Sequence, residues 1–194
     1  MFKKVYFDRF MGPGWPNPTE LRPYFFDPSF RDWTATTYND CWGLNATNID
    51  PKELAGWDEP TDLRLSIVGN PFHGVFFHYW RFGAGDGEAF YARGDLRRLR
   101  EWVQTKDGDL LPVGLFIPFE AAWEAVKEYI ERDGALPGCI EWIAEDDLPP
   151  NAFPRLEVRG RWMVHRGCDS HRASTQAARA EKISRRLLTV TRVI

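Results

Sequence analysis

The pattern of apolar and polar positions becomes regular from residue 61 onward and predicts an antiparallel sheet. Residues 62–69 alternate between apolar and polar side chains, as in a strand with one buried face. An aromatic run over 74–82 is apolar on both faces, which is typical of a central strand. A glycine loop over 83–87 joins this run to the next strand and predicts a hairpin. Further strands are predicted at 88–93, 110–117 and 139–143.

The clearest predicted helix covers residues 119–132. Its apolar side chains recur at spacings of three and four residues and form one stripe. These side chains are Phe119, Ala122, Trp123, Val126, Tyr129 and Ile130. Pro118 suits the beginning of the helix and Gly134 its end. A shorter helix is predicted over 96–103. The fold class is therefore α+β: a mainly antiparallel sheet packed against one principal amphipathic helix, with a basic C-terminal extension.

Residues 11–60 are predicted to be loop-like, because glycine and proline recur too often for long regular elements. Aromatic residues are interspersed among these glycines and prolines, so we expect the segment to pack onto the core.

The character of the chain changes after Pro154. One more strand is predicted over 156–165, and a polar, alanine-rich helix over 170–188. We therefore divide the chain into one α+β domain, 1–154, and a basic tail, 155–194.

Charge is distributed unevenly along the 194 residues. The formal net charge is −3, from 25 basic and 28 acidic side chains. Residues 1–150 hold 15 Lys and Arg against 25 Asp and Glu, whereas residues 151–194 hold 10 against 3. The body therefore carries −10 and the tail +7. Nucleic acid is a poor partner for such a body, because binding phosphate requires clustered cations, and a basic protein partner suits it better.

Cysteine usage and hydropathy indicate a cytoplasmic protein without a membrane segment. Cys41, Cys139 and Cys168 form an odd, sparse set rather than a disulfide framework, which favours a reducing compartment. Asp8 interrupts the N-terminal segment before a signal-peptide core develops. No run approaches the roughly 18 apolar residues of a membrane helix.

Motifs for catalysis or metal binding are weak. The glycines over 83–87 lie between two strands, whereas a dinucleotide-binding loop needs a following helix. His165, Cys168 and His171 have metal-like spacing, but no second ligand pair accompanies them. His73 and His78 lack a neighbouring nucleophile signature such as Gly-x-Ser-x-Gly. We therefore predict no catalytic residue, no cofactor and no metal.

Acidic residues are grouped in the pairs Asp58–Glu59 and Asp107–Asp109 and in the run Glu145–Asp147. Such groups are usually solvated surface acids. A group at the end of an aromatic-bearing strand also describes a patch that imitates a phosphate backbone.

Four segments in order carry a resemblance to a known family. Residues 87–95 (GEAFYARGD) precede residues 115–130 (LFIPFEAAWEAVKEYI), and residues 136–142 (LPGCIEW) and 147–149 (DLP) follow. This order resembles the deaminase-associated immunity protein family (family one) of bacterial polymorphic toxin systems, best over 61–154. The resemblance implies an α+β cytoplasmic protein, not an enzyme, that binds a cognate toxin, typically a nucleic-acid deaminase. The segment 11–60 and the tail lie outside the family pattern.

Together these observations predict an immunity protein that occludes the cationic cleft of a toxin. Glu145, Asp146 and Asp147 would supply the charge, with Glu141 beside them. Trp142 is included as a contact residue, although its inward position in the predicted strand favours the core. Two alternatives stay open at this point: a small hydrolase that uses carboxylates and histidines, and an interaction protein without a toxin partner.

Overall fold

The computed structural model describes residues 1–7, 10–27, 29–33, 40–49, 62–82 and 87–154, and the backbone of 157–158 and 161–162. The chain falls into two compact units, Met1–Arg155 and Leu156–Ile194. None of the helices in the described part of the chain is long and apolar enough to cross a bilayer.

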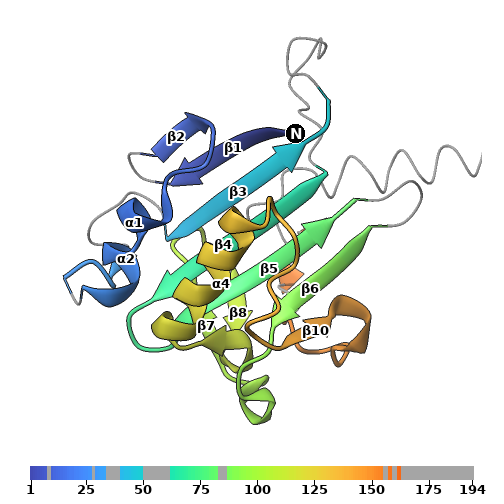
Figure 1. Ribbon diagram of the computed structural model, residues 1–194. Coiled ribbons are helices and arrows are strands. Elements are labelled where there is room, and N and C mark those ends of the chain that lie inside the picture. Colours follow the sequence, from blue (N-terminus) through green and yellow to red (C-terminus); the bar gives the residue numbers. More distant parts are fainter. Residues whose placement is uncertain are drawn as a thin grey trace, which may run out of the picture. The chain divides into compact units, whose positions relative to one another are not determined.

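An eight-stranded antiparallel sheet forms the framework of the first unit (Figure 1). Its strands follow the order β10-β6-β5-β4-β3-β1-β2, and β9 pairs with β5 off this path. The strands are β1 (Phe2–Phe7), β2 (Phe10–Pro13), β3 (Cys41–Thr47), β4 (Leu63–Asn70), β5 (Gly74–Arg81), β6 (Glu88–Ala92), β9 (Phe116–Ile117) and β10 (Trp142–Ala144). The strands β7 (Trp102–Gln104) and β8 (Leu110–Pro112) form a separate hairpin.

One principal helix, α4 (Phe119–Glu131), lies across the sheet, as the apolar stripe predicts (Figure 1). Two one-turn helices, α1 (Pro18–Leu21) and α2 (Pro23–Phe26), precede it in the chain. Pro118 occupies the N-cap of α4, and Gly134 after its end has φ +87°. Both positions match the sequence-based expectation. The fold is therefore sheet-dominated α+β.

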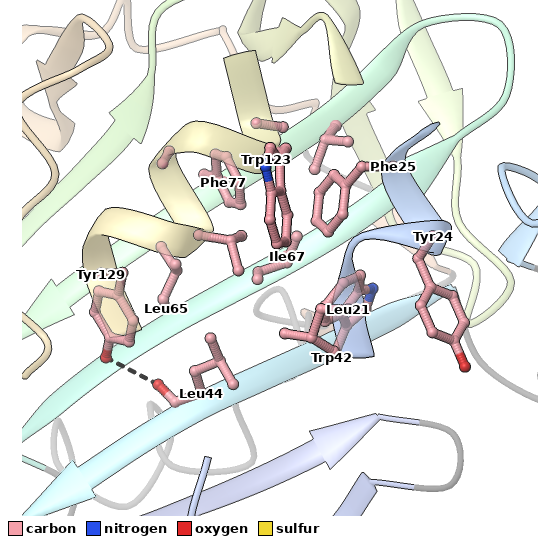
Figure 2. Close-up of a cluster of buried hydrophobic side chains, with 14 of the residues drawn as sticks. Leu21, Tyr24, Phe25, Trp42, Leu44, Leu65, Ile67, Phe77, Trp123 and Tyr129 are labelled. Carbon is pink, nitrogen blue, oxygen red and sulfur yellow. Dashed lines mark hydrogen bonds between the residues drawn. The ribbon is translucent and has the colours of Figure 1, made fainter. Parts of the chain in front are cut away.

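The core lies between α4, the short helices and one face of the sheet (Figure 2). Trp42 and Leu44 of β3 and Ile67 of β4 are at most 1% exposed, and they face Trp123 and Tyr129 of α4. The Tyr129 hydroxyl donates to the Leu44 carbonyl at 3.0 Å, so this buried phenol is satisfied. Burying a side chain of this size contributes about 1.5–3 kcal/mol. Burial of these side chains is therefore the main interaction that stabilises the packing of α4 on the sheet.

The prediction of a packed but loop-like segment over 11–60 was right about packing and wrong about β3. Leu21, Tyr24, Phe25 and Trp33 are buried in the core. Residues 41–47, however, form a seven-residue strand between β1 and β4. Gly43 and Asn45, on the face opposite Trp42 and Leu44, are poor strand formers. Pairing with two neighbouring strands outweighs that local weakness.

The strands at 62–69, 74–82 and 88–93 are confirmed as β4, β5 and β6, and β5 and β6 pair as the predicted antiparallel hairpin.

Four other predicted elements were wrong in type or extent. The predicted helix 96–103 is the single 3-10 turn η2 (Leu96–Arg98) followed by β7. The predicted strand 110–117 is interrupted by the 3-10 turn η3 (Val113–Leu115), which follows Pro112. The strand expected at 139–143 starts only at Trp142. In place of one strand over 156–165, β11 (Glu157–Val158) pairs with β12 (Arg161–Trp162). The helix expected over 170–188 lies outside the described residues.

Gly69 in β4 gives the first testable prediction, because a Cβ at this position would lie 2.3 Å from the buried Trp33 ring. We expect Gly69→Ala to lower the free energy of unfolding by about 1–3 kcal/mol, since the indole must move out of its packed position. Urea denaturation measures the change.

Gly43→Ala in the adjacent strand β3 is the matched control. A Cβ there meets its nearest atom at 3.4 Å, an ordinary contact. Equal destabilisation by the two substitutions would contradict the packing explanation.

Candidate partner-binding surface

The strand β10 forms one edge of the sheet, and the predicted acidic residues flank it: Glu141 directly precedes the strand and Glu145–Asp147 directly follow it. It pairs antiparallel with β6, with Trp142 opposite Ala92 and Ala144 opposite Phe90. The Arg93 N–H donates to the Glu141 carbonyl at 2.9 Å and extends the pairing by one residue. Sheet pairing therefore fixes the backbone from Glu141 to Ala144.

Trp142 holds β10 against the core. Its ring lies 6.2 Å from that of Phe77 and 6.1 Å from that of Tyr79. Its indole N–H donates to the Pro137 carbonyl at 2.7 Å. The ring contacts and the indole hydrogen bond of Trp142 are therefore made within the protein, in agreement with its inward position in the sequence pattern.

Glu128 of α4 fixes the segment that leads into β10. One carboxylate oxygen accepts from the backbone N–H groups of Gly138 and Cys139, each at 3.0 Å. The other accepts from Arg132 at 2.5 Å. The Gly138 hydrogen bond, followed by that from Arg132, lowers the pKa of Glu128 to about 2. Glu128 lies outside the apolar stripe of the helix, and only the structure shows that its carboxylate binds the segment before β10.

The structure brings Glu141, Glu145, Asp146 and Asp147 to this same edge, and we call these four residues the acidic edge. The last three form the 3-10 turn η4 (Glu145–Asp147), which directly follows β10. Glu141 forms an ion pair with Arg93 at 3.2 Å, in which the side chains are 76% and 50% exposed. Asp146 and Asp147 are exposed and form no ion pair with the residues that the structure describes. An exposed pair such as Glu141–Arg93 contributes little stability, so these carboxylates can meet a cationic partner.

None of the other described candidate residues belongs to the acidic edge. The His73 ring lies 6.1 Å from Phe116, and the His78 ring is stacked on Tyr91 at 4.6 Å. Asp107 and Asp109 lie in the β7–β8 turn. Asp58, Glu59, the loop glycines at 83 and 85, and the set His165, Cys168 and His171 lie outside the described residues. Within residues 1–154, less the gaps stated above, no three His, Cys, Asp or Glu side chains form a group that could hold a metal ion.

Phe72 is an exposed residue that the sequence analysis did not single out. It lies in the turn between β4 and β5, and its side chain is 89% exposed. An aromatic residue inside the turn sequence Asn-Pro-Phe-His-Gly is the signal that could have identified it.

Comparison with known proteins gives one match. A family model described as Immunity protein Imm1 matches residues 52–144, which are 93 of the 194 residues. The matched range contains α4, Phe72, Glu141 and Trp142, and it ends directly before η4. No curated protein and no solved structure matches the chain. The match supports an immunity protein family.

The hydrogen bonds of Glu128 to the Gly138 and Cys139 N–H groups, here called the Glu128 tether, give a second prediction. Glu128→Gln keeps the shape of the side chain but removes the charge that strengthens three hydrogen bonds, so we expect a loss of about 1–2 kcal/mol in unfolding free energy at pH 7. Because the folded-state pKa is lowered, this stabilisation is present above the ordinary value near 4.5 and disappears as the pH falls toward about 2. Thermal unfolding of both proteins between pH 7 and pH 2 measures the difference.

Glu124→Gln on the same helix is the control, because among the described residues the one ion pair of Glu124 is a 4.0 Å contact with Lys127. A constant difference between wild type and Glu128→Gln across the pH range would disprove the tether.

Proposed function

We propose that this protein is an immunity protein that binds and neutralises a cognate toxin of a bacterial polymorphic toxin system in the cytoplasm of the producing cell. The observation that carries the proposal is the family-model match over residues 52–144. An immunity protein acts by binding rather than by catalysis, so its function requires an exposed surface that complements the toxin. The acidic edge is our candidate for that surface.

Charge favours a cationic partner. The body carries −10 over residues 1–150, and the acidic edge places four carboxylates within seven positions of the chain. Opposite charge on a toxin would raise the association rate and fix the orientation of the encounter. Because surface charges are screened beyond about 8–10 Å at physiological ionic strength, this contribution should fall as salt is added.

A nucleic-acid deaminase is the toxin that we propose, and the mechanism that we propose is occlusion of its cleft. An enzyme that acts on nucleic acid needs cationic groups along the path of the phosphates. The exposed carboxylates of Asp146 and Asp147 can form ion pairs with such groups in place of phosphates. The resemblance of the segments 87–95 and 115–130 to the deaminase-associated family supports this choice of toxin.

Co-expression with the product of the adjacent gene tests the function. We expect the two proteins to purify together and the toxicity of that product to be relieved. If neither occurs, the immunity function is wrong.

Competition tests the mechanism separately. With a catalytically inactive form of the toxin, a labelled single-stranded oligonucleotide and the immunity protein should exclude each other, and deamination of the oligonucleotide by the active toxin should stop. A ternary complex that retains the oligonucleotide would contradict cleft occlusion while leaving the immunity function intact.

Reversing the charge of the acidic edge gives the third prediction. We expect Asp146→Lys combined with Asp147→Lys to weaken toxin binding by at least 10-fold at low salt, mainly through slower association. The variant should fold normally, because both side chains are exposed. Surface plasmon resonance at two salt concentrations measures both rates.

Glu124→Lys combined with Glu131→Lys on α4 is the matched control, since it changes the net charge equally at another exposed surface. Equal weakening by the two pairs would show that net charge, and not the acidic edge, attracts the partner.

A further inference from the structure

The β4–β5 turn is a rigid projection from the sheet. Its strands end in the pair Asn70 and Gly74, and the Asn70 side-chain oxygen accepts from the backbone N–H groups of Phe72 at 2.9 Å and His73 at 3.1 Å. Gly74 has φ +97°, and a Cβ there would lie 2.1 Å from the Ile117 carbonyl oxygen, so only glycine fits. The side-chain hydrogen bonds and the glycine together fix the conformation of the turn.

Phe72 stands at the tip of this turn and contributes little to the fold. Its side chain is 89% exposed, compared with 65% for Met11 and 44% for Phe2 among the other exposed apolar residues. Within the part of the chain that the structure describes, its ring has no aromatic neighbour in ring contact, whereas the adjacent His73 ring packs near Phe116. A large apolar side chain is therefore held in water by an ordered backbone.

Such an arrangement suits an anchor residue in a protein interface. Aromatic side chains are enriched among the residues that dominate binding energy, because they bury much area at small entropic cost. The entropy of ordering the turn is already offset within the free protein by its own hydrogen bonds, so binding need not supply it. A single protruding ring requires a concave apolar pocket on the partner.

We propose that Phe72 inserts into an apolar pocket of the cognate toxin and forms a second contact, separate from the acidic edge. This inference rests on the immunity function proposed above. In the sheet order, β5 and β6 lie between β4 and the edge strand β10. The toxin therefore spans the end of the sheet where the β4–β5 turn projects as well as its β10 edge.

The fourth prediction concerns Phe72→Ala, measured by calorimetric titration of the full chain with the inactive product of the adjacent gene. We expect the dissociation constant to rise roughly 30-fold, as for a hot-spot truncation, mainly through faster dissociation. Phe72→Leu should retain part of the affinity, because leucine still fills an apolar pocket. The melting temperature should stay unchanged, since the side chain buries almost nothing in the free protein.

Met11→Ala is the matched control, because Met11 is an exposed apolar residue on β2, the edge strand opposite β10 in the sheet order. It should change the dissociation constant less than twofold. Wild-type binding together with unchanged affinity of Phe72→Ala would overturn this inference alone. Absence of wild-type binding would overturn the immunity function and this inference with it. Self-association of the free wild type that is lost in Phe72→Ala would assign the residue to a contact between copies of this chain, and would also overturn the inference.

Discussion

The aromatic cluster around Trp42 is the interaction on which the rest of the structure depends. The Trp42 ring is stacked on Phe7 at 3.8 Å and lies 4.4 Å from Trp33 and 5.5 Å from Phe25. These rings come from β1, β3, α2 and the segment that follows α2, and each is at most 2% exposed. Because offset and edge-on ring contacts have preferred geometries, the cluster fixes how these elements meet as well as stabilising them.

The same cluster positions both proposed contact regions. Trp33 packs directly on Gly69, so β4 and the turn that follows it are held against the core. Phe25 lies 5.7 Å from Trp123 and joins the cluster to α4. From α4, Glu128 reaches the segment before β10 and sets where the acidic edge begins. Charged and apolar contact groups are thereby presented on a rigid framework, which lowers the entropic cost of binding.

In the proposed complex the two regions act on different steps. The acidic edge would act over a distance and increase the rate of productive encounter, whereas Phe72 would act only after contact and slow dissociation. Specificity for one toxin then requires both matching charge and a correctly placed pocket. An unrelated basic protein would satisfy the first requirement alone.

The sequence by itself determined the elements whose patterns are local: β4, β5, β6 and α4, the sheet-dominated α+β class and the uneven charge. It also indicated Glu141 and the run Glu145–Asp147, because clustered charge is visible without a fold. Tertiary structure decided the rest. The strand β3 exists because two distant strands pair with it, and β10 starts late because Glu128 and Trp142 bind the turn before it. The exposure of Phe72 could not be inferred from the sequence either, because burial depends on which segments cover a residue. Hydrophobic periodicity carries no information about contacts between distant parts of the chain.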